Sequence, residues 1–118
     1  MSKGTGSAEA RDVSIGTRYL RLVASGEKTI EVRVGYPSMR RIAPGQLLRF
    51  VSGSEWCLAR VRRVSEYASF EEMLDHEDAR AIGAAQSREE LLGVIREIYP
   101  PEKEALGVLA IEVERVQG

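Results

Sequence analysis

The chain has 118 residues, which is the size of one domain that can bury a core of its own. Hydrophobic residues make up 43% and charged residues 30%, a balance that excludes a wholly disordered protein. No apolar run approaches the ~20 residues of a membrane helix, and the start of the chain lacks the apolar core of a signal peptide, so we expect a cytoplasmic protein without membrane contact. With one cysteine and one histidine, we expect no disulfide, no metal site and no cofactor.

Charge is unevenly divided along the chain, although the net charge is only −1. Residues 1–63 carry twelve Lys and Arg against five Asp and Glu, whereas residues 64–118 carry five against thirteen. This asymmetry indicates a basic face that is offered to an anionic partner. The alternative is that the two halves interdigitate in the fold, so that the charges merely solvate two sides of one domain.

The first half of the chain predicts an arm, a helix, a strand and a loop. Residues 1–13 are rich in Gly and Ser and show no hydrophobic period, which indicates a mobile N-terminal arm ahead of a single domain over residues 14–118. Apolar residues then recur at helical spacing over residues 15–25. Residues 29–34 (TIEVRV) alternate strictly and predict a half-buried strand, and the Gly- and Pro-containing residues 35–45 predict a loop.

The second half predicts three further strands and two capped helices. Residues 46–51 and 56–64 have the composition of strands and are joined by a tight turn. Ser69 and Ser87 each precede a glutamate by three positions, which is the capping-box spacing, so we expect a helix to begin after each serine. Residues 108–116 alternate again and predict the last strand. Four strands, two or three helices and no βαβ rhythm predict an α+β domain with a curled, mainly antiparallel sheet.

The segment GEKTIEVR (residues 26–33) carries the most chemistry for its length. It places a lysine, a carboxylate and a guanidinium, Lys28, Glu31 and Arg33, at a helix-to-strand junction. Glu31 and Arg33 share one face of the expected strand, whereas Lys28 reaches them only if the strand begins after it. If the three converge, they offer donors for a phosphate or a polarised carbonyl, and a carboxylate as acceptor or base. The alternative is a solvated strand face with a surface ion pair worth under ~1 kcal/mol.

This segment resembles the Gly-x-Lys-x-x-Glu-x-Arg motif of the ASCH domain, a member of the PUA-like superfamily. Residues 67–74 and 99–113 also resemble that family, so that the resemblance covers almost the whole chain. It implies a small, curled, mainly antiparallel β-barrel with two to three flanking helices. It further implies a cleft that binds RNA or a nucleotide, with Lys28, Glu31 and Arg33 as cleft residues.

Some small bacterial relatives of that family are amidohydrolases that remove the acetyl group from N4-acetylcytidine. Their motif keeps the lysine but carries a threonine nucleophile where Glu31 stands here. They also use a carboxylate just before the last helix, where residues 83–86 of this chain read GAAQ. We therefore expect that activity to be weak or absent. A different hydrolase, such as a ribonuclease with Glu31 as base and Lys28 as oxyanion donor, remains an alternative.

Two further groups of residues extend the expected site. Tyr36, Arg40 and Arg41 form a basic and aromatic strip suited to phosphate contact and base stacking, and we expect the loop of residues 36–43 to roof the cleft. A solvated loop is the alternative. Trp56 follows a turn, and we expect it to pack against the core rather than to serve as a stacking platform.

These features lead to one principal hypothesis and two alternatives. The principal hypothesis is a nucleic-acid-binding module that takes single-stranded RNA or a nucleotide into the Lys28, Glu31 and Arg33 cleft. The first alternative is a small hydrolase, of the acetylcytidine or the ribonuclease type, that uses Lys28 and Glu31. The second is an interaction protein whose acidic second half docks a basic partner.

Overall fold

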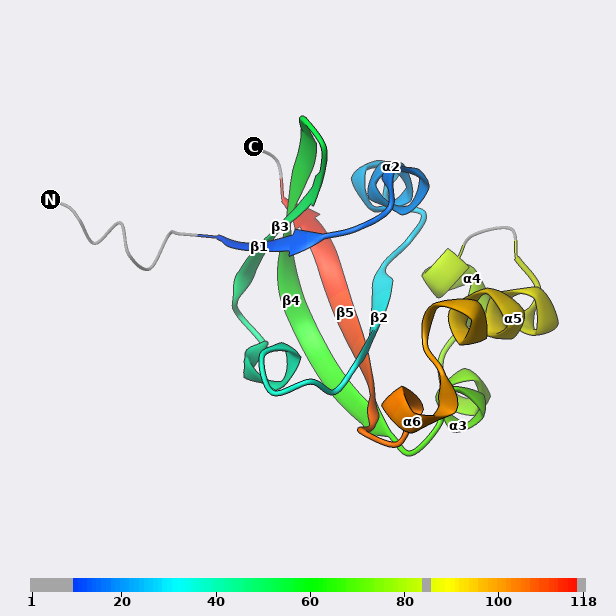
Figure 1. Cartoon of the computed structure of the whole chain (residues 1–118). Helices are drawn as coiled ribbons and strands as arrows, with labels where there is room; N and C mark the ends of the chain where they lie inside the picture. Colours follow the sequence, from blue (N-terminus) through cyan, green and yellow to red (C-terminus); the bar gives the residue numbers. More distant parts are fainter. Residues whose placement is uncertain (1–9, 84–85, 117–118) are drawn as a thin grey trace, which may run out of the picture.

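One curled sheet is the scaffold of the molecule. The computed structural model describes residues 10–83 and 86–116. Five strands form the sheet in the order β1-β3-β4-β5-β2, in which β1 runs parallel to β3 and the other neighbours are antiparallel (Figure 1). The strands are β1 (Arg11–Ser14), β2 (Ile30–Val34), β3 (Leu47–Ser52), β4 (Glu55–Tyr67) and β5 (Val108–Val116). The predicted α+β architecture is therefore confirmed, with the sheet curled into a half-barrel.

Helices flank this sheet, and the three longest are the predicted ones. The helices of the described residues are α2 (Thr17–Ser25), the 3-10 helix η1 (Met39–Arg41), α3 (Phe70–His76), α4 (Ala79–Gly83), α5 (Arg88–Ile98) and α6 (Pro101–Glu104), of which α2, α3 and α5 are the three longest. Ser69 and Ser87 accept hydrogen bonds from the backbone N–H groups of Glu72 and Glu90, so both predicted caps are confirmed. No helix in the described part of the chain is long and apolar enough to span a membrane.

Strand β1 corrects the predicted N-terminal arm. The sequence predicts a mobile arm through residue 13, but Arg11–Ser14 pair with Leu48–Val51 as an edge strand. Val13 is buried in the core. One buried residue in a four-residue strand produces no readable period, which is why the pattern missed this element. The first part of the predicted arm, residues 1–9, lies outside the described residues.

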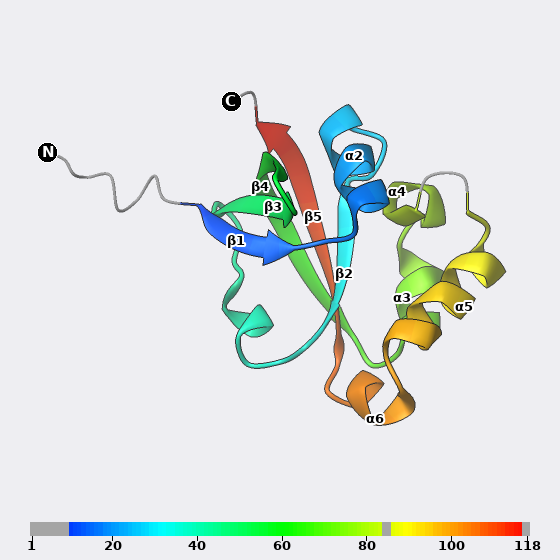
Figure 2. The ribbon, with the colours of Figure 1, turned by 45° about the horizontal axis from the view of Figure 1, so that its top comes forward.

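Strand β5 lies between β4 and β2, and its first four residues, Val108–Ile111, are buried on both faces of the sheet. Leu109, Ile111 and Val113 belong to a core that α2 covers. Val108 and Ala110 belong to a second core that α3, α4 and α5 cover. In Figure 2, α2 lies at the upper end of the edge strand β2, and α3, α4 and α5 lie to the right of this strand. The charged junction before β2 is therefore placed between α2 on one side and α4 and α5 on the other.

The charged residues support the interdigitation alternative. Cations of the basic half pair with acids of the other half: the pairs are Arg40–Glu66, Arg62–Glu114, Arg63–Glu77 and Arg63–Glu112. Chain segments far apart in sequence thus neutralise each other on the folded surface. Fewer positive groups remain for an anionic partner than the composition of residues 1–63 suggests.

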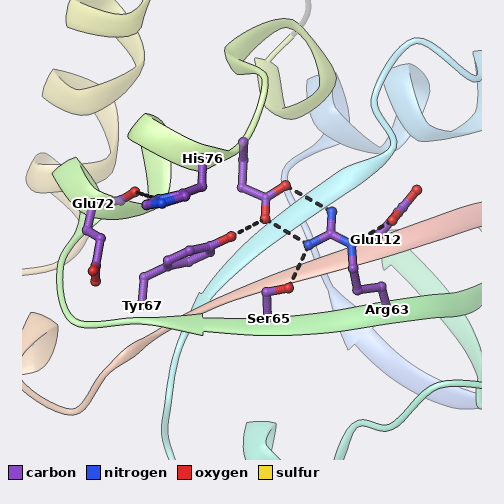
Figure 3. A network of polar contacts seen from close by, with 7 residues as sticks. Arg63, Ser65, Tyr67, Glu72, His76 and Glu112 are labelled. Atoms are coloured by element: carbon purple, nitrogen blue, oxygen red, sulfur yellow. Dashed lines mark hydrogen bonds and ion pairs between the residues drawn. The ribbon is translucent and has the colours of Figure 1, made fainter.

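One of these pairs is the centre of a polar network at the end of α3 (Figure 3). Glu77, which is 8% exposed, accepts hydrogen bonds from Arg63 at 2.8 and 2.9 Å and from the Tyr67 hydroxyl at 2.6 Å. The hydrogen bonds from Arg63 lower the pKa of Glu77 despite its burial. The ring of His76 stacks on Tyr67 with 5.4 Å between their centroids. The network fastens the end of α3 to β4, so we assign it a structural role.

Candidate functional site

A pocket of about 240 Å³ opens beside the edge strand β2. Its lining comes from the segment before α2, from α2 and β2, and from α4 and α5. The apolar and aromatic lining residues are Ile15, Tyr19, Val32, Ile82, Leu91, Val94, Ile95, Ile98 and Tyr99. Lys28, Glu31 and Arg33 supply the charged groups of the same lining. The predicted convergence of these three side chains on one concave site is therefore confirmed.

Lys28 precedes β2 and is 4% exposed. Its ammonium donates to the carbonyl oxygens of Ile30 at 2.6 Å and Ile82 at 2.7 Å, and it lies 3.2 Å from Oε1 of Glu31. An ammonium has three N–H donors, so each has one acceptor in this arrangement. Burial lowers the pKa of Lys28, and the adjacent Glu31 carboxylate opposes that shift. Because Ile82 belongs to α4, Lys28 also ties this helix to the start of β2.

Glu31 is held between two cations. Its Oε2 accepts a hydrogen bond from Nε of Arg33 at 2.5 Å, while Oε1 faces the Lys28 ammonium. Nη2 of Arg33 donates to the carbonyl oxygen of Ser14, also at 2.5 Å. Ser14 ends β1, so this bond links the two edge strands of the sheet. Lys28 and Glu31 are buried and the Arg33 side chain is 19% exposed, so the alternative of a solvated strand face with an ordinary surface ion pair is excluded.

The predicted roof of the pocket is wrong. Among the described residues, none from the 36–43 loop lines the pocket, which α5 and the segment before α2 cover instead. Arg40 is engaged elsewhere: it donates to the carboxylate of Glu66 and to the carbonyl oxygens of Gly35 and Leu106. These bonds hold the loop against the end of β4 and the segment that precedes β5. Long-range partners of this kind leave no trace in the loop sequence itself.

The other two residues of the predicted strip also lie outside the pocket lining. Tyr36 packs against the core under α3, α4 and α5, with the Lys103 ammonium 5.5 Å from its ring centroid. Arg41 is exposed on η1. Contact of Tyr36, Arg40 or Arg41 with a ligand would therefore require a ligand that extends well beyond the pocket.

Trp56 is 54% exposed, so its predicted packing against the core is wrong. Alternation along β4 directs Ala59 and Val61 into the core, which places Trp56 on the outer face of the β3–β4 hairpin. The guanidinium of Arg49 lies 5.7 Å from its ring centroid. Trp56 does not line the pocket.

Sequence reasoning missed the walls of the pocket. The ring centroid of Tyr19 lies 5.6 Å from the Lys28 ammonium, and Tyr99, whose pKa is raised by burial, follows α5. Ile98, the last residue of α5, is 61% exposed although it is a large apolar side chain. In the sequence Ile98 simply continues the apolar stripe of its helix. Only the folded structure identifies Ile98 as a pocket residue, because its exposure beside the pocket cannot be seen in the sequence.

The lining as a whole suits binding of a small planar polar group. Apolar and aromatic walls with a few convergent polar groups are typical of small-ligand sites. The described residues contain no group of three His, Cys, Asp or Glu side chains that could hold a metal ion. Glu31 and Arg33, with the rings of Tyr19 and Tyr99, supply polar and aromatic groups of this lining.

Comparisons with known proteins find one family and several solved structures. The family model of the ASCH domain matches residues 13–117. The crystal structure of the hypothetical protein PH0355 is similar at 32% identity and a TM-score of 0.82, covering 92% of this chain and 100% of that one. The solution structure of protein PF0455 from Pyrococcus furiosus is similar at 32% identity and a TM-score of 0.75, covering 93% and 100%. The ASCH domain from Lactobacillus crispatus JV V101 is similar in fold, at 13% identity and a TM-score of 0.65, and the match covers 98% of this chain and 86% of that one. None of the curated proteins matches the sequence.

Proposed function

The chain belongs to the ASCH domain family, whose PUA-like fold is often associated with RNA binding, and we propose that it is a nucleic-acid-binding module. The proposed ligand is a nucleotide or a short single-stranded RNA, of which one base enters the pocket. The observation that supports this most directly is the buried Glu31 carboxylate, held between Lys28 and Arg33 in the lining of an aromatic and aliphatic pocket. Such walls accept the flat faces of a base, and the polar groups accept its edge.

The size of the pocket favours one base over a longer segment. Its volume of about 240 Å³ lies below the roughly 300–1,000 Å³ of pockets that enclose drug-sized ligands. The sugar and phosphates of a bound strand would then lie outside, where Arg18 is exposed in the first turn of α2 beside Tyr19. With one or two phosphates neutralised, we expect log affinity to fall against log salt with a slope of about −0.7 to −1.4.

A change at the rim of the pocket tests this proposal without disturbing the buried ion pairs. Ile98→Glu places a carboxylate on an exposed residue of the pocket lining. The new charge should repel phosphate and reduce hydrophobic contact with the base, weakening the binding of single-stranded RNA by about tenfold or more. Fluorescence anisotropy with a labelled oligonucleotide at low salt measures the affinity.

Two control variants locate the binding surface. Leu106→Glu is the matched control, because Leu106 is also an exposed large apolar residue but does not line this pocket. It should bind RNA as the unchanged protein does. Trp56→Glu removes the exposed ring on the hairpin and should also leave the affinity unchanged. The proposal fails if either control weakens binding as strongly as Ile98→Glu, or if the unchanged protein binds no RNA at low salt.

The geometry also leads to a prediction about acetylcytidine hydrolysis. Glu31 stands where the hydrolases that the motif resembles carry their threonine, and its two cation partners disfavour attack on a carbonyl. The three N–H groups of Lys28 all have acceptors, so none is left to stabilise an oxyanion. We expect no release of cytidine from N4-acetylcytidine above the uncatalysed rate, as followed by chromatography. Release that Glu31→Gln abolishes would contradict this prediction.

A further inference from the structure

We propose that the pocket selects guanine among the bases, with Glu31 accepting from two adjacent N–H groups of the base and Arg33 donating to its carbonyl oxygen. This inference rests on the proposed function and adds the identity of the recognised base. It follows from the hydrogen-bond acceptors of Glu31 and the donors of Arg33 that have no partner among the described residues and line the pocket.

Glu31 retains the capacity to accept two more hydrogen bonds. A carboxylate oxygen has two lone-pair sites, and here Oε1 is engaged by Lys28 and Oε2 by Arg33. One site therefore remains on each oxygen. Glu31 lines the pocket, so an occupant that leaves these oxygens without donors carries a free-energy cost. The pocket thus favours a ligand with two neighbouring N–H donors.

The two cations differ in what they can still donate. The N–H groups of Lys28 are taken by two carbonyl oxygens and by Glu31. Arg33 uses Nε for Glu31 and one N–H of Nη2 for Ser14, which leaves the second N–H of Nη2 and both of Nη1 without an acceptor among the residues that the structure describes. Nη2 lies on the same side of the guanidinium as the Nε–H that is bonded to Oε2, so its second N–H is the free donor nearest to the carboxylate in the pocket lining. The three groups offered to a ligand are therefore two acceptors and a neighbouring donor.

Guanine presents the complementary set along its Watson–Crick edge. Its N2 amino group and N1–H are two adjacent donors, and O6 beside them is an acceptor. Adenine and cytosine each present one amino donor next to an acceptor nitrogen, and uracil presents one N–H between two carbonyl groups. Each of these three bases leaves one Glu31 oxygen without an N–H partner. Sites built around buried polar groups discriminate strongly against ligands that leave those groups unpaired.

A series of nucleotides tests the inference on the unchanged protein. Titration calorimetry with the 5′-monophosphates of guanosine, inosine, adenosine, cytidine and uridine measures the base preference directly. Inosine differs from guanosine only by the missing 2-amino group, so it should bind about ten- to a hundredfold more weakly, as expected for one hydrogen bond to a charged acceptor. The 1-methyl derivative of guanosine monophosphate, which lacks the N1–H, should show no measurable binding.

The outcomes separate this inference from the proposed function. Equal binding of guanosine and inosine monophosphates, or tighter binding of another base, overturns the guanine inference while the nucleotide-binding proposal stands. Absence of binding by every nucleotide and by single-stranded RNA overturns both. Tighter binding of guanosine monophosphate with loss in the 1-methyl derivative supports the inference.

A variant protein connects the preference to Glu31. Glu31→Gln replaces one carboxylate oxygen by an amide donor, so the ratio of guanosine to inosine affinity should fall to near one. Glu27→Gln is the matched control, because Glu27 is exposed and does not line the pocket. It should keep the full ratio. Circular dichroism verifies that each variant is folded, and if Glu31→Gln is not, the nucleotide series on the unchanged protein decides the matter.

Discussion

Replacing Lys28 by methionine is expected to lower the free energy of unfolding by about 3–5 kcal/mol. Methionine keeps most of the side-chain volume, so the loss comes from the missing ammonium rather than from a large cavity. Without it, the buried carbonyl oxygens of Ile30 and Ile82 lose their donor, and Glu31 keeps Arg33 alone. Denaturation in urea, followed by circular dichroism, measures the change.

A surface ion pair provides the control for this prediction. Arg21 also pairs with a glutamate, Glu55, at 2.9 Å, but both side chains are exposed. Exposed pairs contribute little to stability, so Arg21→Met should leave the free energy of unfolding nearly unchanged. If Lys28→Met were no more destabilising than Arg21→Met, the Lys28 ammonium would not be the structural tie that the geometry indicates.

Replacing Arg63 by methionine is expected to be the second most damaging of these changes, at about 3 kcal/mol. Arg63 makes two hydrogen bonds to Glu77 and one each to Glu112 and Ser65. Glu77 is buried, so the variant leaves its charge with the Tyr67 hydroxyl as its one remaining partner in the network. The urea midpoint at neutral pH measures the loss.

The pH dependence of this loss distinguishes a charge effect from a packing effect. Arg63 lowers the pKa of Glu77, so Glu77 contributes stability above its ordinary value of 4.5 and loses it as the pH falls through the lower folded-state pKa. Arg63→Met removes the largest cause that lowers the pKa of Glu77, so this pKa rises relative to the unchanged protein and Glu77 takes up a proton at a higher pH. The stability difference between the two proteins should therefore be largest near pH 7 and shrink on acidification. A difference that stays constant down to about pH 4 would show that packing, not charge, is responsible.

Elements that carry their own local signal were predictable from the sequence. Strands β2 to β5 alternate or have strand composition, α2 has a helical period, and α3 and α5 have serine caps whose partners lie three residues away. Strand β1 and the short helices α4 and α6 were missed. Their four or five residues hold too few apolar positions to define a period, and β1 exists because Val13 and its backbone pair with β3.

The predictable part of the site is the part encoded within a few residues. Lys28, Glu31 and Arg33 lie so close in sequence that the turn into β2 brings them together. The wrong roof and the misplaced Trp56 have a different origin. The roof depends on which part of the sheet the loop meets, and that depends on contacts such as Arg40 with Glu66, across 26 positions of the chain. The outward position of Trp56 follows instead from the alternation along β4, in which it has the opposite parity to Ala59 and Val61.

The sequence by itself therefore determined the α+β class, the positions of most elements and the identity of the charged triad, because hydrophobic period, capping and nearest-neighbour spacing act over a few residues. The tertiary structure alone decided that the Lys28 ammonium has the carbonyl oxygens of Ile30 and Ile82 and the carboxylate of Glu31 as its acceptors. It also decided that α5 rather than the 36–43 loop covers the pocket. Those outcomes depend on burial, since a buried ammonium has to find an acceptor for each N–H wherever the fold places one. The sequence therefore identifies the side chains that donate, whereas the acceptors that they reach are determined by the packing of the folded chain.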